Sequence, residues 1–200
     1  MTKLETKKKS KESSLLNTAF EFFTTKGFSK TSITDIASKA GVGKGTFYLY
    51  FKDKYDIRNK LIARKSELVF SHAAKVLSQH TEQTSFDDKF ILLVDDIINQ
   101  LDENKSLLNF ISKNLSWGVF MAALSAPADN NMDFRDAYYK LVSLSAKPIR
   151  EPELMLYMIV ELVSSTCYST ILYKEPCSIE ALKPELYTTI RSIIAQFTEK

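Results

Sequence analysis

The chain has 200 residues, of which 44% are hydrophobic and 26% are charged. This is the composition of an ordinary globular protein, and a chain of this length can bury a sizeable core without cross-links. The two cysteines exclude a disulfide framework, and the low content of glycine and proline argues against a turn-rich all-β sandwich. The N-terminus shows no apolar secretion signal, so we expect a cytoplasmic protein.

Charge is divided unevenly along the chain. Residues 1–65 carry 15 basic and 6 acidic side chains, a net charge of +9, whereas residues 66–200 carry 12 basic and 18 acidic side chains, a net charge of −6. A basic first third on a mildly acidic body is typical of a nucleic-acid-binding domain joined to a second domain. The alternative is a solvated tail, because a lysine cluster at residues 7–11 supplies part of the excess.

Helical periodicity in the first third predicts short helices with sharp ends. Apolar side chains share one helical face over residues 15–23, and Gly27 follows as a helix stop. A second apolar face covers residues 33–40. Ser32 precedes it as a helix cap, and Asp35 completes a capping box.

Beyond the first third, amphipathic segments continue to the end of the chain, and no alternating run is long enough for a sheet. A loop is predicted at 125–131, and Pro184 is expected to kink or restart the last helix. We therefore predict an all-α protein of about nine helices, with a three-helix helix-turn-helix domain at residues 1–52 and a helical bundle at residues 53–200. The predicted helices of the bundle begin near residue 53 and continue at 86–101, 105–124, 132–146, 153–174 and 178–198.

The most apolar stretch, residues 154–163, could suggest a membrane span. Glu161 interrupts it, and hydroxyl side chains follow it, whereas a span needs about 20 mostly apolar residues. We expect a helix buried in a bundle or a dimer interface, and no membrane contact. Glu161 itself is either a paired interface charge or an anchor for a cationic ligand.

Residues 31–54 carry the main functional pattern, because two short helices are joined there by a tight turn at 40–43. This is helix-turn-helix geometry, in which the second helix lies in the major groove of DNA. Gly41 permits the turn, and Gly45 removes bulk where the helix start meets the duplex. The outward side chains offered to phosphates and base edges are Lys44, Thr46, Tyr48, Tyr50 and Lys54.

At these residues the chain resembles the TetR family of bacterial transcriptional regulators. The resemblance covers residues 10–60 and includes Ala40–Val42, Lys44–Tyr48 and Tyr50–Lys54. It implies a homodimer, a palindromic operator in double-stranded DNA and a small-molecule effector that releases the DNA. In such a dimer the helices at 153–174 and 178–198 would pair with their copies.

Two residues depart from the family pattern, and others allow a second interpretation. Gly43 stands where many relatives carry serine, which puts one helix cap and one phosphate contact in doubt. Tyr50 stands where many carry histidine. Tyr48 and Tyr50 could instead pack against the domain, and the lysines could be merely solvated. Thr34 either contacts DNA or only supports its own helix.

No catalytic, metal-binding or cofactor-binding arrangement is evident, so we expect neither an enzyme nor a cofactor. His72 and His80 have no acidic or cysteine partner at ligand spacing, and Cys167 is expected to be a small buried hydrophobe. A phosphate-binding loop is excluded because Lys44 is followed by Gly45 instead of serine or threonine.

Aromatic and methionine side chains are concentrated between residues 110 and 168, as in the walls of small-molecule pockets. The alternative is an ordinary core. We expect an apolar or aromatic effector, with a cationic one favoured over an anionic one by the −6 charge of the body. The candidate lining residues are Phe110, Trp117, Phe120, Tyr138 and Met158.

The sequence as a whole predicts a ligand-responsive transcriptional repressor that dimerises through its last two helices. A charge at Ile190 or Ile193 is expected to break that dimer. The main alternative is an effector-free DNA-binding adaptor that recruits a protein, and a helical enzyme is a weaker one because catalytic residues are missing.

Overall fold

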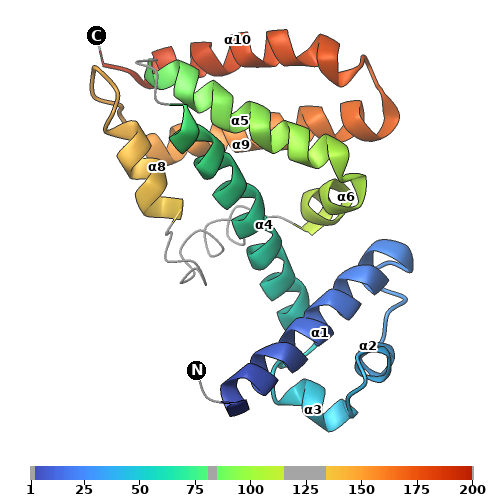
Figure 1. The fold of residues 1–200 in the computed structure, drawn as a ribbon. Helices are drawn as coiled ribbons and strands as arrows, with labels where there is room; N and C mark the ends of the chain where they lie inside the picture. The colour runs from blue at the N-terminus through green and yellow to red at the C-terminus, as the bar shows by residue number, and fades with distance from the viewer. Residues whose placement is uncertain (1–2, 81–84, 115–133, 200) are drawn as a thin grey trace. The chain divides into compact units, whose positions relative to one another are not determined.

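The computed structural model describes residues 3–80, 85–114 and 134–199, and over these residues the chain is all-α with nine helices (Figure 1). The all-α prediction is therefore confirmed. The chain divides into two compact units, Met1–Arg64 and Lys65–Lys200. The predicted loop at 125–131, together with Trp117 and Phe120, lies outside the described residues.

The first unit contains α1 (Lys3–Thr25), α2 (Ile33–Lys39), α3 (Lys44–Tyr48) and the beginning of α4 (Lys54–Gln79). Helix α1 begins well before the apolar face predicted at 15–23. Its first turns are polar, so apolar periodicity does not reveal them, and they carry the lysine cluster at residues 7–11 on exposed positions. The cluster thus belongs to a helix rather than to an unstructured tail.

The ends of these helices follow the predicted local signals. Gly27 and Gly41 adopt φ angles of 86° and 71°, a left-handed conformation that glycine tolerates without strain. Ser32 caps α2 by accepting from the backbone N–H of Asp35, and the Asp35 carboxylate accepts from the backbone N–H of Ser32. The hydrogen bond from the backbone N–H of Ser32 is the main cause that holds the pKa of Asp35 below its ordinary value, and the one from the Ser32 side chain adds to it.

The first unit extends to Arg64, beyond the domain end at residue 52 that the sequence predicts. The reason is the start of α4, where Ile57, Leu61 and Ile62 are fully buried. An apolar face of this kind completes the core of a small domain, so the boundary lies inside a continuous helix.

The second unit contains the rest of α4 and five further described helices. Its core joins side chains from α5, α6, α8, α9 and α10. Helix α9 packs along α10, and α5 and α6 also contact this pair. The helix bounds are Phe86–Glu103 for α5, Lys105–Asn114 for α6, Phe134–Val142 for α8, Pro152–Tyr173 for α9 and Ile179–Phe197 for α10.

Pro184 lies inside helix α10, as expected, and the helix does not restart there. Its apolar face also packs into the core of its own unit, where Ile190 is fully buried and Ile193 is partly buried against the same cluster. A charge at Ile190 would therefore disrupt the fold of the protomer itself, so this residue is not a test of dimerisation.

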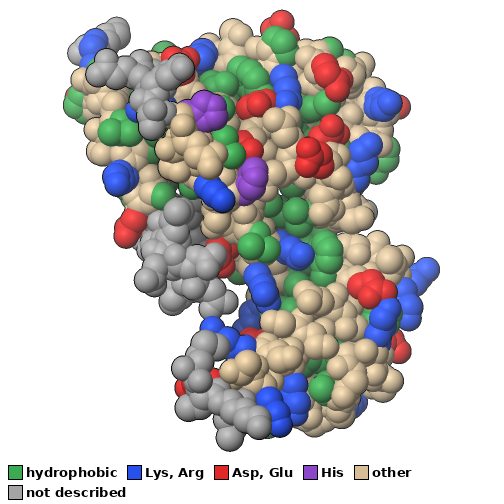
Figure 2. Space-filling view, in the orientation of Figure 1, with side chains coloured by type: hydrophobic (Ala, Val, Ile, Leu, Met, Phe, Trp, Pro, Cys, Tyr) green, Lys and Arg blue, Asp and Glu red, His purple; other side chains and the backbone are tan. Residues whose placement is uncertain are grey.

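Polar pairs connect α5 to α10 on the outside of this core. The Lys183 ammonium donates to Asp95 over 2.7 Å, the Tyr187 hydroxyl donates to the same carboxylate, and Arg191 pairs with Asp88 over 2.7 Å. In Figure 2, acidic and basic side chains accordingly lie side by side over the region of α5 and α10. These pairs link the exposed edges of α5 and α10.

Helix α9 is long and apolar enough to cross a membrane by length and composition. A helix in the core of a folded domain meets the same criterion, and six α9 residues, among them Met155 and Cys167, are buried inside the second unit. Burial accounts for part of its apolar character, while other apolar side chains, such as Leu154 and Met158, are exposed.

Candidate nucleic-acid interface and cavity

Helix α3 is held by its aromatic inner face. Phe47 and Phe51 are almost completely buried, and their ring centroids lie 5.4 Å apart. The backbone N–H of Val42 donates to Ala37 over 2.9 Å, which closes the turn between α2 and α3. With Phe47 directed inward, the remaining side chains of this short helix face away from the core.

Most of the predicted DNA-contacting residues lie on that outward surface. Tyr48 is 51% exposed, and its ring makes a T-shaped contact with Phe47 at a centroid distance of 5.6 Å. Thr34 and Lys44 are exposed, whereas Thr46 and Tyr50 are half-buried. The helix-turn-helix motif therefore presents hydroxyl and ammonium groups at its surface, and such groups can hydrogen-bond to phosphates or base edges.

Gly43 and Gly45 are not required by the packing of the domain. A Cβ at either position would meet no atom within 4 Å, and neither residue has a positive φ. Gly43 is the N-cap of α3 and supplies no side-chain hydrogen bond, as its departure from serine predicts. The absence of a side chain at Gly45 leaves the start of α3 open to close approach.

Lys54 occupies a different position from the one expected. Its ammonium donates to the carbonyl oxygens of Phe28 and Thr31 over 2.8 and 3.0 Å and lies 4.4 Å from the centroid of the Phe28 ring. Two of its three donors are thus used inside the domain. This geometry favours a structural clamp between α4 and the segment after α1 over a phosphate contact.

Leu49 is a candidate that the sequence interpretation missed. It follows α3 directly and is 79% exposed, more than any other large hydrophobic side chain among the described residues. A signal was available, because Phe47 and Phe51 share the inner face and the residue midway between them must point away. Apolar side chains in this position can contact the methyl group of thymine.

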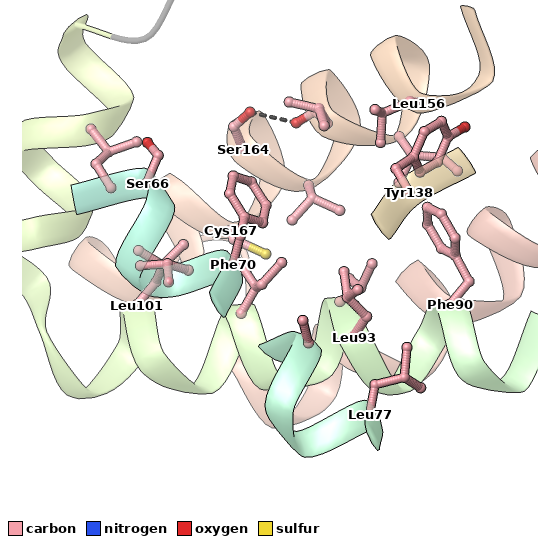
Figure 3. A pocket seen from close by; sticks show the side chains of 18 of the residues that line it. Ser66, Phe70, Leu77, Phe90, Leu93, Leu101, Tyr138, Leu156, Ser164 and Cys167 are labelled. Atoms are coloured by element: carbon pink, nitrogen blue, oxygen red, sulfur yellow. Dashed lines mark hydrogen bonds between the residues drawn. The ribbon is translucent and has the colours of Figure 1, made fainter. Parts of the chain in front are cut away.

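The second unit contains a cavity of about 150 Å³ (Figure 3). Helices α4, α5, α6, α8 and α9 all contribute to its wall, and all of its described lining residues belong to this unit. None of these residues is charged. Leucine, isoleucine and valine form most of the wall, including Leu77, Leu93 and Leu156.

Of the residues predicted to bind an effector, only Tyr138 is among the described lining residues. Its hydroxyl donates to the carbonyl of Pro152 over 2.6 Å, and burial raises its pKa. Phe110 is buried in α6 but does not line the cavity, and Met158 is 37% exposed on α9. For Phe110 and Met158, side-chain direction rather than aromatic or methionine content decides that they do not line the cavity.

The described wall of the cavity carries no charged side chain. Because no described lining residue is acidic, the −6 charge of the body does not favour a cation at this cavity. Glu161 is exposed on α9 and is not part of the wall. Cys167 does line it, and burial raises the pKa of its thiol to about 11, so the group stays neutral as a small hydrophobe.

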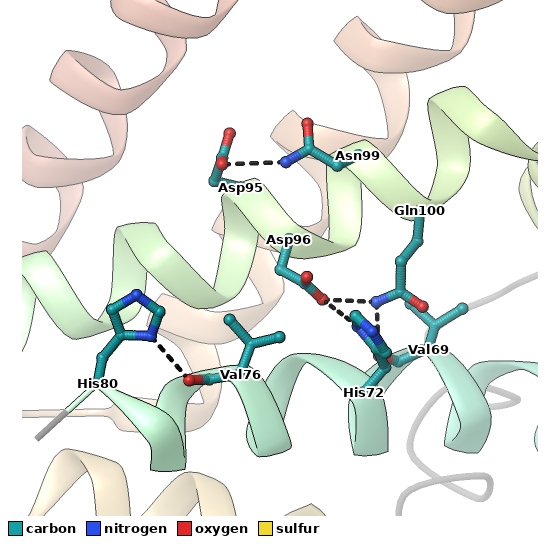
Figure 4. Close-up of polar contacts among 8 residues, drawn as sticks. All are labelled: Val69, His72, Val76, His80, Asp95, Asp96, Asn99 and Gln100. Carbon is teal, nitrogen blue, oxygen red and sulfur yellow. Dashed lines mark hydrogen bonds and ion pairs between the residues drawn. The ribbon is translucent and has the colours of Figure 1, made fainter.

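His72 contacts an acidic residue that lies 24 positions further along the chain. Its Nδ1 atom lies 2.9 Å from Asp96 of α5, and Gln100 donates to both Asp96 and the carbonyl of Val69 (Figure 4). His80 contacts only the Val76 carbonyl in the same figure. The first group ties α4 to α5, and no cluster of metal-ligand type occurs among the described residues.

A two-helix motif with an outward second helix defines the class of helix-turn-helix proteins. Within that class, residues 15–61 match the family model described as "Bacterial regulatory proteins, tetR family". Residues 15–61 of the N-terminal unit thus carry the sequence pattern of the TetR family, which confirms the resemblance seen in the sequence.

Individual relatives agree with this assignment. The chain is 37% identical over 86 residues to the HTH-type transcriptional regulator YvdT of Bacillus subtilis, covering 43% of this chain and 41% of the relative. The chain thus spans about two fifths of that relative's length.

Solved structures share the fold over nearly the whole chain. A TetR-family transcription regulator from Shewanella sp. PV-4 matches with a TM-score of 0.66 at 16% identity, over 95% of this chain and 99% of the other. FadR from Bacillus subtilis, in complex with stearoyl-CoA, matches with a TM-score of 0.66 at 19% identity, over 90% and 98% of the two chains. At these identities the likeness concerns the fold.

Proposed function

We propose that this protein is a cytoplasmic transcriptional repressor that binds a palindromic DNA operator as a homodimer and releases it when a small apolar effector binds. The observation that carries the proposal is the outward surface of α3, where Lys44, Tyr48 and Leu49 are exposed around a fully buried Phe47. A surface of this kind on a basic domain suits the major groove.

The dimer contact is proposed for the outer faces of α9 and α10. Leu154 and Met158 are 47% and 37% exposed on α9 and lie one helical turn apart. Exposed apolar side chains that share a helical face are typical of interfaces. The inner face of α10 is not available for this contact because Ile190 and its neighbours fill the core.

The effector is proposed to bind in the cavity of the second unit. The aliphatic wall supports a ligand with a hydrocarbon part, and the solved FadR structure of similar fold holds stearoyl-CoA. A ligand acts on DNA binding only through a difference in affinity between two states of the protein. The same cavity favours an effector-responsive regulator over the effector-free adaptor.

The test is selection of operator DNA from a random pool by the purified full-length protein, followed by titration of the selected site. We expect a site with two-fold symmetry and a log–log salt dependence with a slope near −0.9 for each phosphate neutralised. A slope near zero, or selected sequences without symmetry, would contradict the proposal for DNA binding or for the dimer, respectively.

A further inference from the structure

We infer that the cavity binds an uncharged amphiphile, an aliphatic chain with one hydrogen-bonding group, and that Ser66 on α4 receives this group. The inference rests on the proposed function in that it identifies the chemistry of the effector. Ser66 is not among the aromatic and methionine residues that the sequence analysis predicts to bind an effector.

The wall sets the charge of the ligand. None of the described lining residues is charged, and most of them carry aliphatic or phenyl side chains, such as Phe70, Phe90 and Leu93. A carboxylate or ammonium placed there would lose its hydration without gaining a partner of opposite charge, which is strongly unfavourable. The buried part of the ligand is therefore neutral.

Ser66 supplies the polar contact. Its residue is only 4% exposed, and its Oγ atom is the one buried side-chain oxygen or nitrogen in the described part of the chain that has no hydrogen-bond partner. A helical serine commonly satisfies its hydroxyl on the carbonyl one turn earlier, as Ser164 does with Val160 in the same wall. An unpaired hydroxyl is costly when buried, and a ligand group in the cavity would remove that cost.

The position of Ser66 gives the ligand a direction. Figure 3 shows Ser66 and Leu101 toward one end of the cavity, with Phe90 and Tyr138 toward the other. Leu77 lies three turns along α4 from Ser66, which corresponds to roughly 16 Å of helix. The chain of the ligand would extend from Ser66 toward Leu77. Since α4 begins in the first unit, the polar contact would be made to the helix that both units share.

The experiment measures displacement of the neutral fluorophore N-phenylnaphthylamine from the full-length protein by decanol, decane and decanoate at neutral pH. We expect decanol to bind about tenfold more tightly than decane, since one hydrogen bond separates them, and ionised decanoate to bind more weakly than decanol. Ser66→Ala should lower decanol affinity to that of decane or below it, because the buried hydroxyl of decanol then lacks a partner, and should leave decane unchanged. Ser78→Ala, on the same helix but outside the cavity wall, is the matched control and should leave all three affinities unchanged, because its hydroxyl donates to the Lys75 carbonyl.

A second readout separates a ligand contact from a structural one. Ser66→Ala should raise the thermal midpoint of the ligand-free protein, because it removes an unpaired buried hydroxyl; a serine with a structural role would lower it. Decanoate that binds as tightly as decanol, probe displacement by none of the three compounds, or decanol affinity unchanged in Ser66→Ala would overturn the inference.

Operator binding, measured in the same samples, distinguishes this failure from failure of the proposed function. If decanol binds through Ser66 and operator affinity stays constant, the effector role fails and the inference stands. If decanol weakens operator binding equally in wild type and Ser66→Ala, the effector role stands and the inference fails.

Discussion

Gly41 and Gly45 lie in the same motif but place different demands on the backbone. Gly41 has φ +71°, a conformation that other residues rarely adopt, whereas Gly45 has an ordinary helical backbone. Neither position is crowded within the domain. Backbone conformation and access for DNA can therefore be tested separately.

We predict opposite effects of alanine at these two glycines. Gly41→Ala should destabilise the domain by about 1–2 kcal/mol, the usual cost of the left-handed conformation. Gly45→Ala should stabilise it by roughly 0.5 kcal/mol through helix propensity and still weaken operator binding, because the new methyl group faces the duplex. Thermal unfolding and operator titration of both variants check this. Unchanged operator affinity in Gly45→Ala would show that the start of α3 does not approach DNA closely.

The exposed side chains of α3 should affect binding without affecting stability. Lys44→Ala, Tyr48→Ala and Leu49→Ala are each expected to weaken operator binding by about 1–3 kcal/mol if they contact bases, with little change in thermal midpoint. Lys75→Ala, at an exposed lysine of α4 in the second unit, is the control and should bind like wild type. Wild-type affinity in all three variants would mean that α3 faces the DNA differently.

At the scale of elements, the contact between α5 and α10 depends on the ionised form of Asp95. Burial alone would raise the pKa of Asp95, but hydrogen bonds from Lys183 and Tyr187 outweigh it and hold the pKa below its ordinary value of 3.8. A depressed pKa in the folded state contributes stability above pH 3.8, and that contribution is lost as the pH falls through the folded-state pKa.

Asp95→Asn should therefore lower stability most at neutral pH. We expect the difference in the free energy of unfolding between wild type and variant to be constant from pH 7 to about pH 5 and to shrink as the pH falls below 3.8. Urea unfolding at a series of pH values measures this. A difference that does not depend on pH would mean that the hydrogen bonds, and not the charge, connect the two helices.

The proposed dimer makes a prediction at the level of helix faces. Met158→Lys, on the exposed face of α9, should give a folded monomer with reduced operator affinity, because a charge disfavours the apolar contact between copies. Ile190→Lys should instead unfold the protomer, since its side chain is fully buried. Sedimentation and circular dichroism distinguish the two results. A Met158→Lys protein that remains dimeric at micromolar concentration would place the interface elsewhere.

At the scale of the whole molecule, effector and operator are expected to compete through one equilibrium. If a ligand weakens operator binding by a given factor, bound operator must weaken the ligand by the same factor, with a coupling of roughly 1–3 kcal/mol. Fluorescence titration of ligand with and without operator DNA, and of operator with and without ligand, measures both factors. Unequal factors would show that more than one ligand site is involved.

Local signals account for what could be predicted from the sequence. The helices, the capping box at Ser32 and the glycine turns depend on residues within a few positions of one another, so periodicity and spacing reveal them. The same holds for the outward direction of Tyr48, which follows from Phe47 on the opposite face. The TetR-family domain is defined by these short-range patterns.

Only the tertiary structure decided the features that join distant segments. Lys54 is held by carbonyls of Phe28 and Thr31, the first unit extends into α4, and the inner face of α10 fills the core of its own protomer. The cavity is formed by five helices whose lining residues share no sequence spacing, and its aliphatic wall and the unpaired hydroxyl of Ser66 exist only through their packing. The sequence by itself thus determined the DNA-binding motif, because that motif is local; the cavity depended on the packing of helices from across the second unit, because long-range contacts decide which side chains meet.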